Sequence, residues 1–534
     1  MEQEKDLKKI KITWRTAFAV ALVLFILFGL GTKLILSINM SLNSDMVGEG
    51  LEAMDIWKHQ NYFLSGYYLP SQDTFLFTEL LPFQLIPQIL TDYDPAALKL
   101  MTYIEFALGA GVLAYIVFMI TGEALNALLF TALAVNVPPI AYQFFSLPTS
   151  HAGTVVFLGI ILALLIYVNK KEGEKKQKTK KGRKVRDTSI QWPYVIALIV
   201  LTALTVVSDT IILPWLILPI ILAYLLVVKE KSRTMNIVVA LMAAVSAIVY
   251  IYKTYFVYTW VVQDVVTGKG TSNIFSTILP LYFKALALTL NEGLYSVFNG
   301  FAGFGILEAL SLAAFAALAI YSAWNILHNG QNRFFNGILL ASVVIMFAMF
   351  LVSNYSIDIS SARYLTFTAF AVLMLIAASC RKDDKICGAL ALSLLLISAI
   401  YGYSSVSGTA ASPNAQEYGL IDYMKQNNLT FGYSSYWYSN ILTYLSGEDI
   451  TVRATFFYRD DMKPNVWLAN ERWYQSTPDR SFILVDNSSI GDNGREVISA
   501  LTTKLNASEA LHYEKYDIYP LEGYHIGPFQ VVRD

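Results

Sequence analysis

The sequence predicts a polytopic α-helical membrane protein with a small α/β domain at its C-terminal end. Of its 534 residues, 55% are hydrophobic and only 15% are charged, and the mean hydropathy of +0.48 lies well above that of soluble proteins. The apolar residues gather in runs of membrane-spanning length, and every second connection between these runs is basic. With a net charge of −1, the chain shows no nucleic-acid-binding surface.

About eleven spans are expected, because a helix needs roughly 20 apolar residues to cross the hydrocarbon core of a bilayer. The first run, 16–38, is too long for the core of a signal peptide and lacks a small-residue cleavage pattern, so it reads as an uncleaved span. The other spans are expected over 98–121, 124–145, 151–168, 192–208, 211–228, 236–260, 301–325, 335–353, 363–380 and 387–405.

The basic connections orient these spans. Cations gather over 170–186, 229–233 and 381–385 and at Arg333, so the positive-inside rule predicts a cytoplasmic N-terminus, a cytoplasmic loop over 169–191 and an outer C-terminus. Cys380 and Cys387 flank the last basic turn. Because the cytoplasm is reducing, we do not expect them to form a disulfide.

Two domains follow from this topology: a transmembrane domain, 1–404, with a long first outer loop, 39–97, and a soluble extracytoplasmic domain, 405–534. The first loop should carry surface helices. In the second domain, helices are expected over 416–426, 437–445 and 494–505, and strands over 429–433, 450–457, 481–485 and 530–532. A further apolar segment, 275–290, contains Lys284 and is expected to be an interfacial or re-entrant helix on the outer face.

The first outer loop opens with three acids, Asp45, Glu49 and Glu52, at spacings that would place them on one helical face. Such a face is either solvated or functional. Asp45 lies a few residues beyond the first span, at the membrane boundary, where partial burial suits a carboxylate to act as a general base. We therefore expect Asp45 to be catalytic, and Glu49 and Glu52 to be supporting or solvated.

Asp92 and Asp94 have the spacing of a metal-binding Asp-x-Asp pair. Their position just before a span makes helix capping the favoured interpretation. His151 opens the fourth span on the outer side, where it either contacts a substrate or packs as a structural residue. Four other acids near the outer face are expected to be solvated or to cap helices: Asp209, Asp264, Glu292 and Asp358.

Arg363 opens the tenth span on the outer side, where the positive-inside bias makes a cation unexpected. A guanidinium there can hold a phosphate through two parallel hydrogen bonds, or it can extend to lipid headgroups. Lys284, Lys253 and Lys33 are weaker candidates for the same anion. No Ser/His/Asp triad, zinc-ligand spacing or phosphate loop is present, so hydrolase and ATPase interpretations have no motif to support them.

These features resemble the GT-C superfamily of membrane glycosyltransferases, which includes protein O-mannosyltransferases and lipid A aminoarabinose transferases. The likeness rests on an acid just past the first span, a long first outer loop, many spans and a soluble outer tail. Arg363, Tyr364 and Leu365 look like the Arg-Tyr-Leu feature of many members, and segment 432–437 looks like the tails of bacterial members. In that family the first-loop aspartate is catalytic, which implies this role for Asp45.

The resemblance implies transfer of a sugar, with inversion, from a polyprenyl-phosphate donor to a hydroxyl of a glycan, lipid or protein in the cell envelope. Asp45 would be the base, and Arg363 and Tyr364 would hold the phosphate. The second outer connection, 145–151, lacks the acids of metal-dependent oligosaccharyltransferases, so a metal-independent enzyme is favoured unless Asp92 and Asp94 fold into the site. A lipid-linked glycan flippase or transporter, and a ligase or polymerase using pyrophosphate-linked donors, stay open as alternatives.

Overall fold

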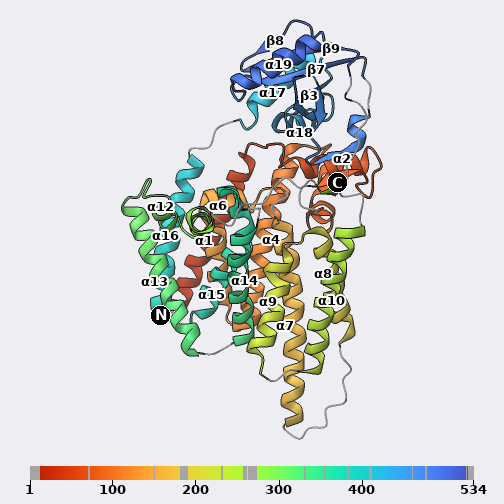
Figure 1. The fold of residues 1–534 in the computed structure, drawn as a ribbon. Helices are drawn as coiled ribbons and strands as arrows, with labels where there is room; N and C mark the ends of the chain where they lie inside the picture. The colour runs from red at the N-terminus through yellow and green to blue at the C-terminus, as the bar shows by residue number, and fades with distance from the viewer. Residues whose placement is uncertain are drawn as a thin grey trace, which may run out of the picture.

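The computed structural model describes residues 13–69, 73–148, 151–180, 191–229, 232–256, 261–262, 273–329, 332–353, 356–381, 384–407, 412–459, 461–475, 478–524 and 526. It has two parts, a bundle of long helices and a smaller region, built around a β-sheet, that sits on one end of the bundle (Figure 1). We call this smaller region, residues 412–526, the tail, and residues 39–94, between the first two long helices, the first connection.

Eight helices of the described residues are long and apolar enough to cross a membrane. They are α1 (Trp14–Ile38), α4 (Pro95–Thr121), α7 (Ala152–Lys180), α10 (Arg233–Phe256), α13 (Ile306–Asn329), α14 (Arg333–Val352), η5 (Ile359–Leu365) continued by α15 (Thr366–Ser379), and α16 (Lys385–Ser407). The chain is therefore a polytopic helical protein of the membrane type.

The predicted count of eleven spans is not confirmed. The runs 192–208 and 211–228 form α8 (Trp192–Ser208), of 17 residues, and the joined pair η2 (Leu213–Ile217) and α9 (Leu218–Val227). A 17-residue helix covers only about 26 Å at 1.5 Å per residue, which is less than the hydrocarbon core of about 30 Å.

The run 124–145 is broken into α5 (Ala124–Val135) and α6 (Pro139–Phe145), which meet at 93°. Two consecutive prolines at the break lack the backbone N–H that a continuous helix requires. Lys33 donates a hydrogen bond from Nζ to the carbonyl oxygen of Val137, at 2.6 Å, where the helix stops. Lys33 was a weak candidate for binding the substrate anion. Its side chain is only 1% exposed, and its ammonium group instead pairs with the carbonyl at the break between α5 and α6.

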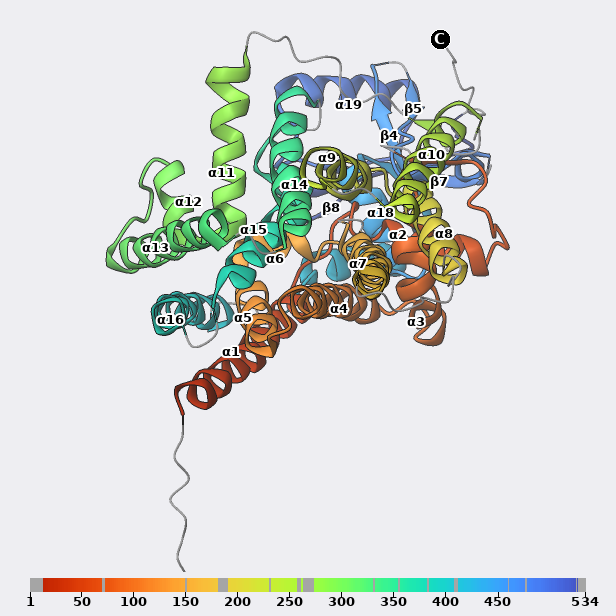
Figure 2. The same ribbon diagram turned by 90° about the horizontal axis from the view of Figure 1, so that it is seen from below.

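The segment over 275–290 does not reach membrane-spanning length, as the sequence predicts. It forms η4 (Ile274–Ile278) and α11 (Leu279–Leu290), followed by α12 (Glu292–Phe298). In Figure 2, α7 and α9 are seen end-on, whereas α11 is seen lengthwise. This helix therefore lies across the direction of the bundle rather than along it.

The tail contains a six-stranded mixed sheet in the order β5-β4-β3-β7-β9-β8, with β3 parallel to both of its neighbours. Its strands are β3 (Phe431–Ser434), β4 (Thr451–Phe457), β5 (Met462–Pro464), β7 (Arg480–Asp486), β8 (Leu511–Tyr513) and β9 (Tyr516–Glu522). Its helices are α17 (Ala415–Gln426), α18 (Tyr436–Leu445), η6 (Glu471–Tyr474) and α19 (Asp492–Lys504). The predicted elements of the tail are thus present, except the strand over 530–532, which lies outside the described residues.

The first connection folds into α2 (Gly48–Trp57), β1 (Tyr67–Leu69), η1 (Leu76–Gln84) and α3 (Leu85–Leu90). β1 pairs antiparallel with β6 (Ala469–Asn470) of the tail and parallel with β2 (Val261–Val262). One apolar core contains residues from both the first connection and the tail. Gly50 allows α2 to approach α18 closely, because a Cβ at this position would lie 2.2 Å from the Tyr444 ring. The tail is thus packed directly onto the segment that follows α1.

Candidate active site

Asp45 lies in a turn between α1 and α2. Asn43 Oδ1 accepts a hydrogen bond from the backbone N–H of Asp45 at 3.0 Å, and α2 begins only at Gly48. The prediction that Asp45, Glu49 and Glu52 share one helical face is therefore wrong. The turn leaves the Asp45 side chain half-buried, which keeps its carboxylate accessible while the surrounding backbone is fixed.

Tyr436, the first residue of α18, donates a hydrogen bond from its hydroxyl to Asp45 Oδ1. Its side chain is 9% exposed. Burial, and then the neighbouring Asp45 carboxylate, raise the pKa of Tyr436 well above its usual value, so the hydroxyl keeps its proton and acts as a donor. The sequence did not single out Tyr436 as a site residue, although it lies in segment 432–437, which resembles the tails of bacterial GT-C members.

Arg363 lies on η5, at the start of its span. Its guanidinium carbon is 5.1 Å from the centroid of the Tyr364 ring, and Nη2 donates a hydrogen bond to the Tyr364 hydroxyl at 3.2 Å. The charge of Arg363 interacts with the carboxylates of Asp45 and Asp358. Asp358 also caps η5, as the sequence allows, by accepting a hydrogen bond from the Ser360 N–H at 2.8 Å. The structure thus brings Asp45 and Arg363 within electrostatic reach of each other.

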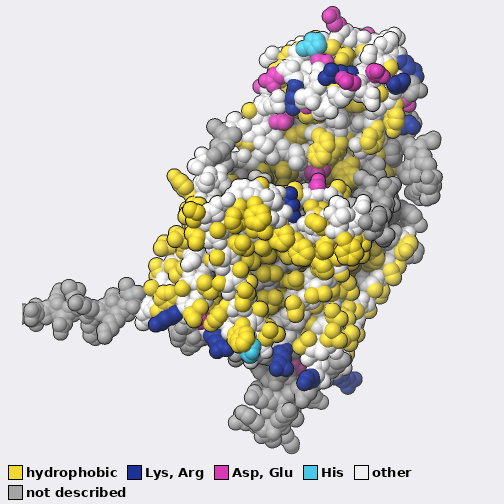
Figure 3. Space-filling view, turned by 60° about the vertical axis from the view of Figure 1, so that its left-hand side comes forward, with side chains coloured by type: hydrophobic (Ala, Val, Ile, Leu, Met, Phe, Trp, Pro, Cys, Tyr) yellow, Lys and Arg dark blue, Asp and Glu magenta, His cyan; other side chains and the backbone are white. Residues whose placement is uncertain are grey.

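A hollow separates the tail from the bundle on one face of the molecule, and both acidic and basic side chains are visible in it (Figure 3). Trp437 of α18, next to Tyr436, is 57% exposed. A half-buried carboxylate that accepts a proton and a nearby guanidinium that binds an anion are the two groups needed for attack by a hydroxyl and departure of a phosphate.

His151 lies behind Tyr364. Its ring centroid is 5.7 Å from that of Tyr364, and its Nδ1 is 2.6 Å from Asp209 Oδ2, which also accepts a hydrogen bond from the Thr154 hydroxyl at 2.6 Å. His151 is 5% exposed and Asp209 is 0% exposed. Asp209 is therefore not solvated, but it does cap the helical break, because its Oδ1 accepts a hydrogen bond from the Ile211 N–H at 3.1 Å. His151 supports the aromatic ring that Arg363 covers.

A second buried pair of ionisable side chains, Lys253 and Asp73, lies beside the pair of His151 and Asp209. Lys253 Nζ is 2.9 Å from Asp73 Oδ1, with the two side chains 1% and 7% exposed. The backbone N–H and the hydroxyl of Thr210 also donate to this oxygen, at 2.8 Å and 3.0 Å. Lys253 was a weak candidate for the substrate anion, but its charge is already neutralised by Asp73, which the sequence did not single out.

Glu49 and Glu52 lie in the core of the first connection, at 0% and 3% exposure, so the expectation that they are solvated is wrong. Burial, and then the charges of Glu49 and Asp55, raise the pKa of Glu52 well above its usual value. Burial, and then Glu49 and Glu105, do the same to the pKa of Glu79. Glu49 and Glu79 lie close to each other and to Glu105 of α4, where η1 packs against both α2 and α4.

The two acids of the Asp-x-Asp pair do not converge on a shared site. Asp94 caps α4, accepting a hydrogen bond from the Ala96 N–H at 2.8 Å, as the sequence predicts, and Asp92 is exposed. Within the described ranges, no group of three or more His, Cys, Asp or Glu side chains is arranged to hold a metal ion.

Lys284 and Glu292 lie on the helices that cross the bundle direction. Lys284 Nζ is 6.0 Å from the centroid of the Tyr295 ring. Burial raises the pKa of Glu292 to about 7, against the charge of Lys33, so the expectation that Glu292 is freely solvated is wrong. Asp264 lies outside the described residues.

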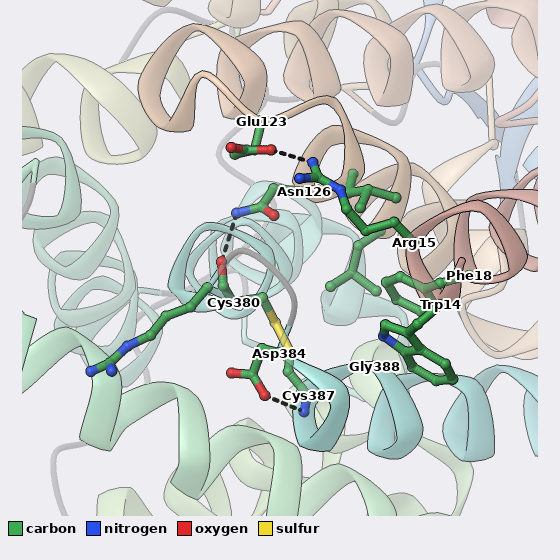
Figure 4. Close-up of a pocket in the computed structure, with 12 residues that line it drawn as sticks. Trp14, Arg15, Phe18, Glu123, Asn126, Cys380, Asp384, Cys387 and Gly388 are labelled. Carbon is green, nitrogen blue, oxygen red and sulfur yellow. Dashed lines mark hydrogen bonds and ion pairs between the residues drawn. A yellow bond between two sulfur atoms is a disulfide. The ribbon is translucent and has the colours of Figure 1, made fainter. Parts of the chain in front are cut away.

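A pocket at the other end of α1 contains the two cysteines (Figure 4). Cys380 and Cys387 form a disulfide, with Cα atoms 6.1 Å apart, contrary to the expectation from a reducing compartment. The turn between α15 and α16 brings their side chains together. Arg15 Nη2 and Glu123 Oε2 form an ion pair at 2.6 Å beside them. The 25 residues of α1 span about 37 Å at 1.5 Å per residue, so this pocket is separate from Asp45.

No family model matches the chain, and no curated protein matches it. Among solved structures, the chain is similar to an Archaeoglobus fulgidus oligosaccharyltransferase crystallised with zinc and sulfate, with 17% sequence identity and a TM-score of 0.49. The alignment covers 81% of this chain and 62% of the other, so the chain spans less than two thirds of the length of that protein. A likeness at this level assigns no activity, and the functional proposal therefore rests on the residues of the site.

Proposed function

We propose that the chain is an inverting membrane glycosyltransferase that moves a sugar from a polyprenyl-phosphate donor to an acceptor hydroxyl on the outer face of the membrane. The observation that carries this proposal is the convergence of Asp45 and Arg363, from distant parts of the sequence, between the bundle and the tail. A carboxylate is suited to general base catalysis. A guanidinium is suited to hold a phosphate.

The position of Asp45 suits a lipid-linked donor. α1 ends at Ile38, so Asp45 follows the end of a span by a few residues, at the depth of the headgroups. Tyr62 and Phe63 of the first connection are 60% and 81% exposed, and exposed aromatic residues at this depth anchor a protein to the interface. The prenyl chain of a donor would lie in the hydrocarbon while its phosphate and sugar would reach the hollow.

In the proposed reaction, the acceptor oxygen attacks the anomeric carbon from the face opposite the phosphate. A bond forms between this oxygen and the anomeric carbon as the bond from that carbon to the phosphate oxygen breaks, which inverts the configuration. The acceptor proton passes to the Asp45 carboxylate. The lipid phosphate leaves with the bonding electron pair, and Arg363 stabilises the charge that develops on it.

Tyr364 and His151 would act by placing Arg363. Tyr364 lies against the guanidinium, and the His151 ring, tied to Asp209, lies against Tyr364. Lys284 is a candidate for a second contact to the phosphate. In this proposal the reaction needs no metal ion, because the base and the anion-binding group are both side chains. Treatment with EDTA should then leave the initial rate unchanged, and a loss that Mg²⁺ or Mn²⁺ restores would overturn this part.

Asp45→Asn tests the proposed function. The amide keeps the shape of the side chain but cannot take the acceptor proton, so we expect transfer from radiolabelled polyprenyl-phosphate sugars to fall by about 10²- to 10⁴-fold, with donor binding retained. Asp449→Asn is the matched control, because Asp449 is a surface acid, 68% exposed, paired with Lys425 in the tail. Near-normal transfer by Asp45→Asn would exclude Asp45 as the base.

A further inference from the structure

The turn that carries Asp45 is hydrogen-bonded to the tail at three residues, Leu42, Ser44 and Asp45. Asn414 and Leu42 exchange two hydrogen bonds: the Leu42 N–H donates to Asn414 Oδ1 at 2.8 Å, and Asn414 Nδ2 donates to the Leu42 carbonyl at 2.9 Å. The Ile441 N–H donates to the Ser44 hydroxyl at 3.3 Å. The backbone just before Asp45 is therefore fixed by hydrogen bonds to α18 and to the residue that precedes α17, as well as by its connection to the bundle.

We propose that Tyr436 is a positioning residue for Asp45, so that the tail completes the active site. The inference rests on the proposed function. The Tyr436 hydroxyl donates to Asp45 Oδ1, which leaves Oδ2 to accept the proton of the acceptor. The hydrogen bond fixes the plane of the carboxyl group, so that the other oxygen presents one direction to the incoming hydroxyl.

The Tyr436 ring is itself held in place. Its centroid lies 5.2 Å from the centroid of the Trp437 ring and 6.4 Å from that of the Trp467 ring, and both contacts are edge-to-face. Tyr436 is 9% exposed, whereas Trp437 is 57% exposed. The Tyr436 hydroxyl therefore cannot leave Asp45 without displacing packed aromatic residues.

Asp45 interacts with groups from two different elements, Tyr436 of α18 and Arg363 of η5. Tyr436 donates a hydrogen bond to the carboxylate, and Arg363 places a positive charge near it. Loss of the Tyr436 hydroxyl alone should therefore weaken transfer but not abolish it.

Tyr436→Phe is the test variant, because it removes one hydroxyl and keeps the ring. Tyr438→Phe is its matched control. Tyr438 lies two residues further along α18 and also donates a hydrogen bond to a carboxylate, Asp486 Oδ2. The control removes the same chemical interaction from the same helix without touching Asp45.

Two readouts distinguish positioning from a structural role. For Tyr436→Phe we expect kcat to fall about tenfold, the loss expected from removing one hydrogen bond to a charged group, with the KM for the donor unchanged. The midpoint of thermal unfolding in detergent should be the same in Tyr436→Phe and Tyr438→Phe.

The two proposals fail in different ways. An unchanged kcat in Tyr436→Phe, or an equal fall in kcat in Tyr438→Phe, would overturn the positioning role while leaving the proposed function standing. Failure of Tyr436→Phe to fold, with Tyr438→Phe folding normally, would also overturn it, because the hydroxyl would then be a structural contact. Full transfer by Asp45→Asn would instead overturn the proposed function.

Discussion

Arg472→Ala should loosen the contact between the tail and the first connection. Asp55, whose side chain is 3% exposed, has oxygens 2.9 Å and 2.8 Å from Arg472 Nη2. Without the guanidinium, the carboxyl keeps the Asn61 and Asn470 amides as hydrogen-bond partners. A hydrogen bond to a charged group contributes about 1.5 to 3 kcal/mol. Because the Arg472 side chain is 42% exposed, solvent screening places the effect at the lower end, about 2 kcal/mol.

A loss of about 2 kcal/mol corresponds to a roughly 30-fold rise in the undocked population. Hydrogen exchange measured by mass spectrometry should show this rise in peptides covering 67–69 and 469–470, where β1 pairs with β6. Arg459→Ala is the control, because its ion pair with Glu496 has side chains 70% and 69% exposed and should contribute little. Unchanged exchange in Arg472→Ala, or equal acceleration in both variants, would refute this explanation of the interface.

Three further outcomes follow from buried charges. Lys253→Met should lower stability by about 3 to 5 kcal/mol, because it leaves the Asp73 carboxyl buried without its cation; thermal unfolding in detergent measures this, and an unchanged midpoint would contradict it. Asp209→Asn should lower the transfer rate without unfolding the protein, because His151 loses the carboxylate that orients it behind Tyr364; a normal rate in a folded variant would exclude this support. Because the folded pKa of Glu52 is raised, the folded state binds this proton more tightly than the unfolded chain, so stability should fall as pH rises above the ordinary carboxyl range. Glu52→Gln should flatten that dependence above about pH 5, just above the ordinary Glu pKa, and an unaltered slope would assign it to other groups.

The sequence predicted those features that depend on local patterns. Hydropathy located the helices of the bundle, since runs of apolar residues are needed wherever lipid is the solvent. Alternation and turn residues located the helices and strands of the tail that the structure describes. Asp45 was singled out because it follows the first span at the membrane boundary, and Arg363 because a cation is unexpected on the outer side. In the structure the charge of Arg363 interacts with the Asp45 carboxylate.

The sequence did not predict features created by contacts between distant segments. Tyr436 is separated from Asp45 by 391 positions, and no local pattern links them. Glu49 and Glu52 have the spacing of a solvated helical face, but both are buried, with Glu49 close to Glu79 of η1 and Glu105 of α4. Lys33 was considered for an anion, yet it binds the carbonyl that a proline break leaves unpaired, which only the three-dimensional arrangement reveals.

Asp45 and Arg363 are proposed to act on one lipid-linked sugar, and a structure with that donor tests this claim most directly. The measurement is a structure of the Asp45→Asn variant in lipid nanodiscs with a polyprenyl-phosphate sugar bound. We expect the phosphate to lie against the Arg363 guanidinium and the anomeric carbon to face residue 45, with Tyr436 beside it. A phosphate bound at Lys284 alone, or a sugar lying outside the hollow between bundle and tail, would contradict the claim.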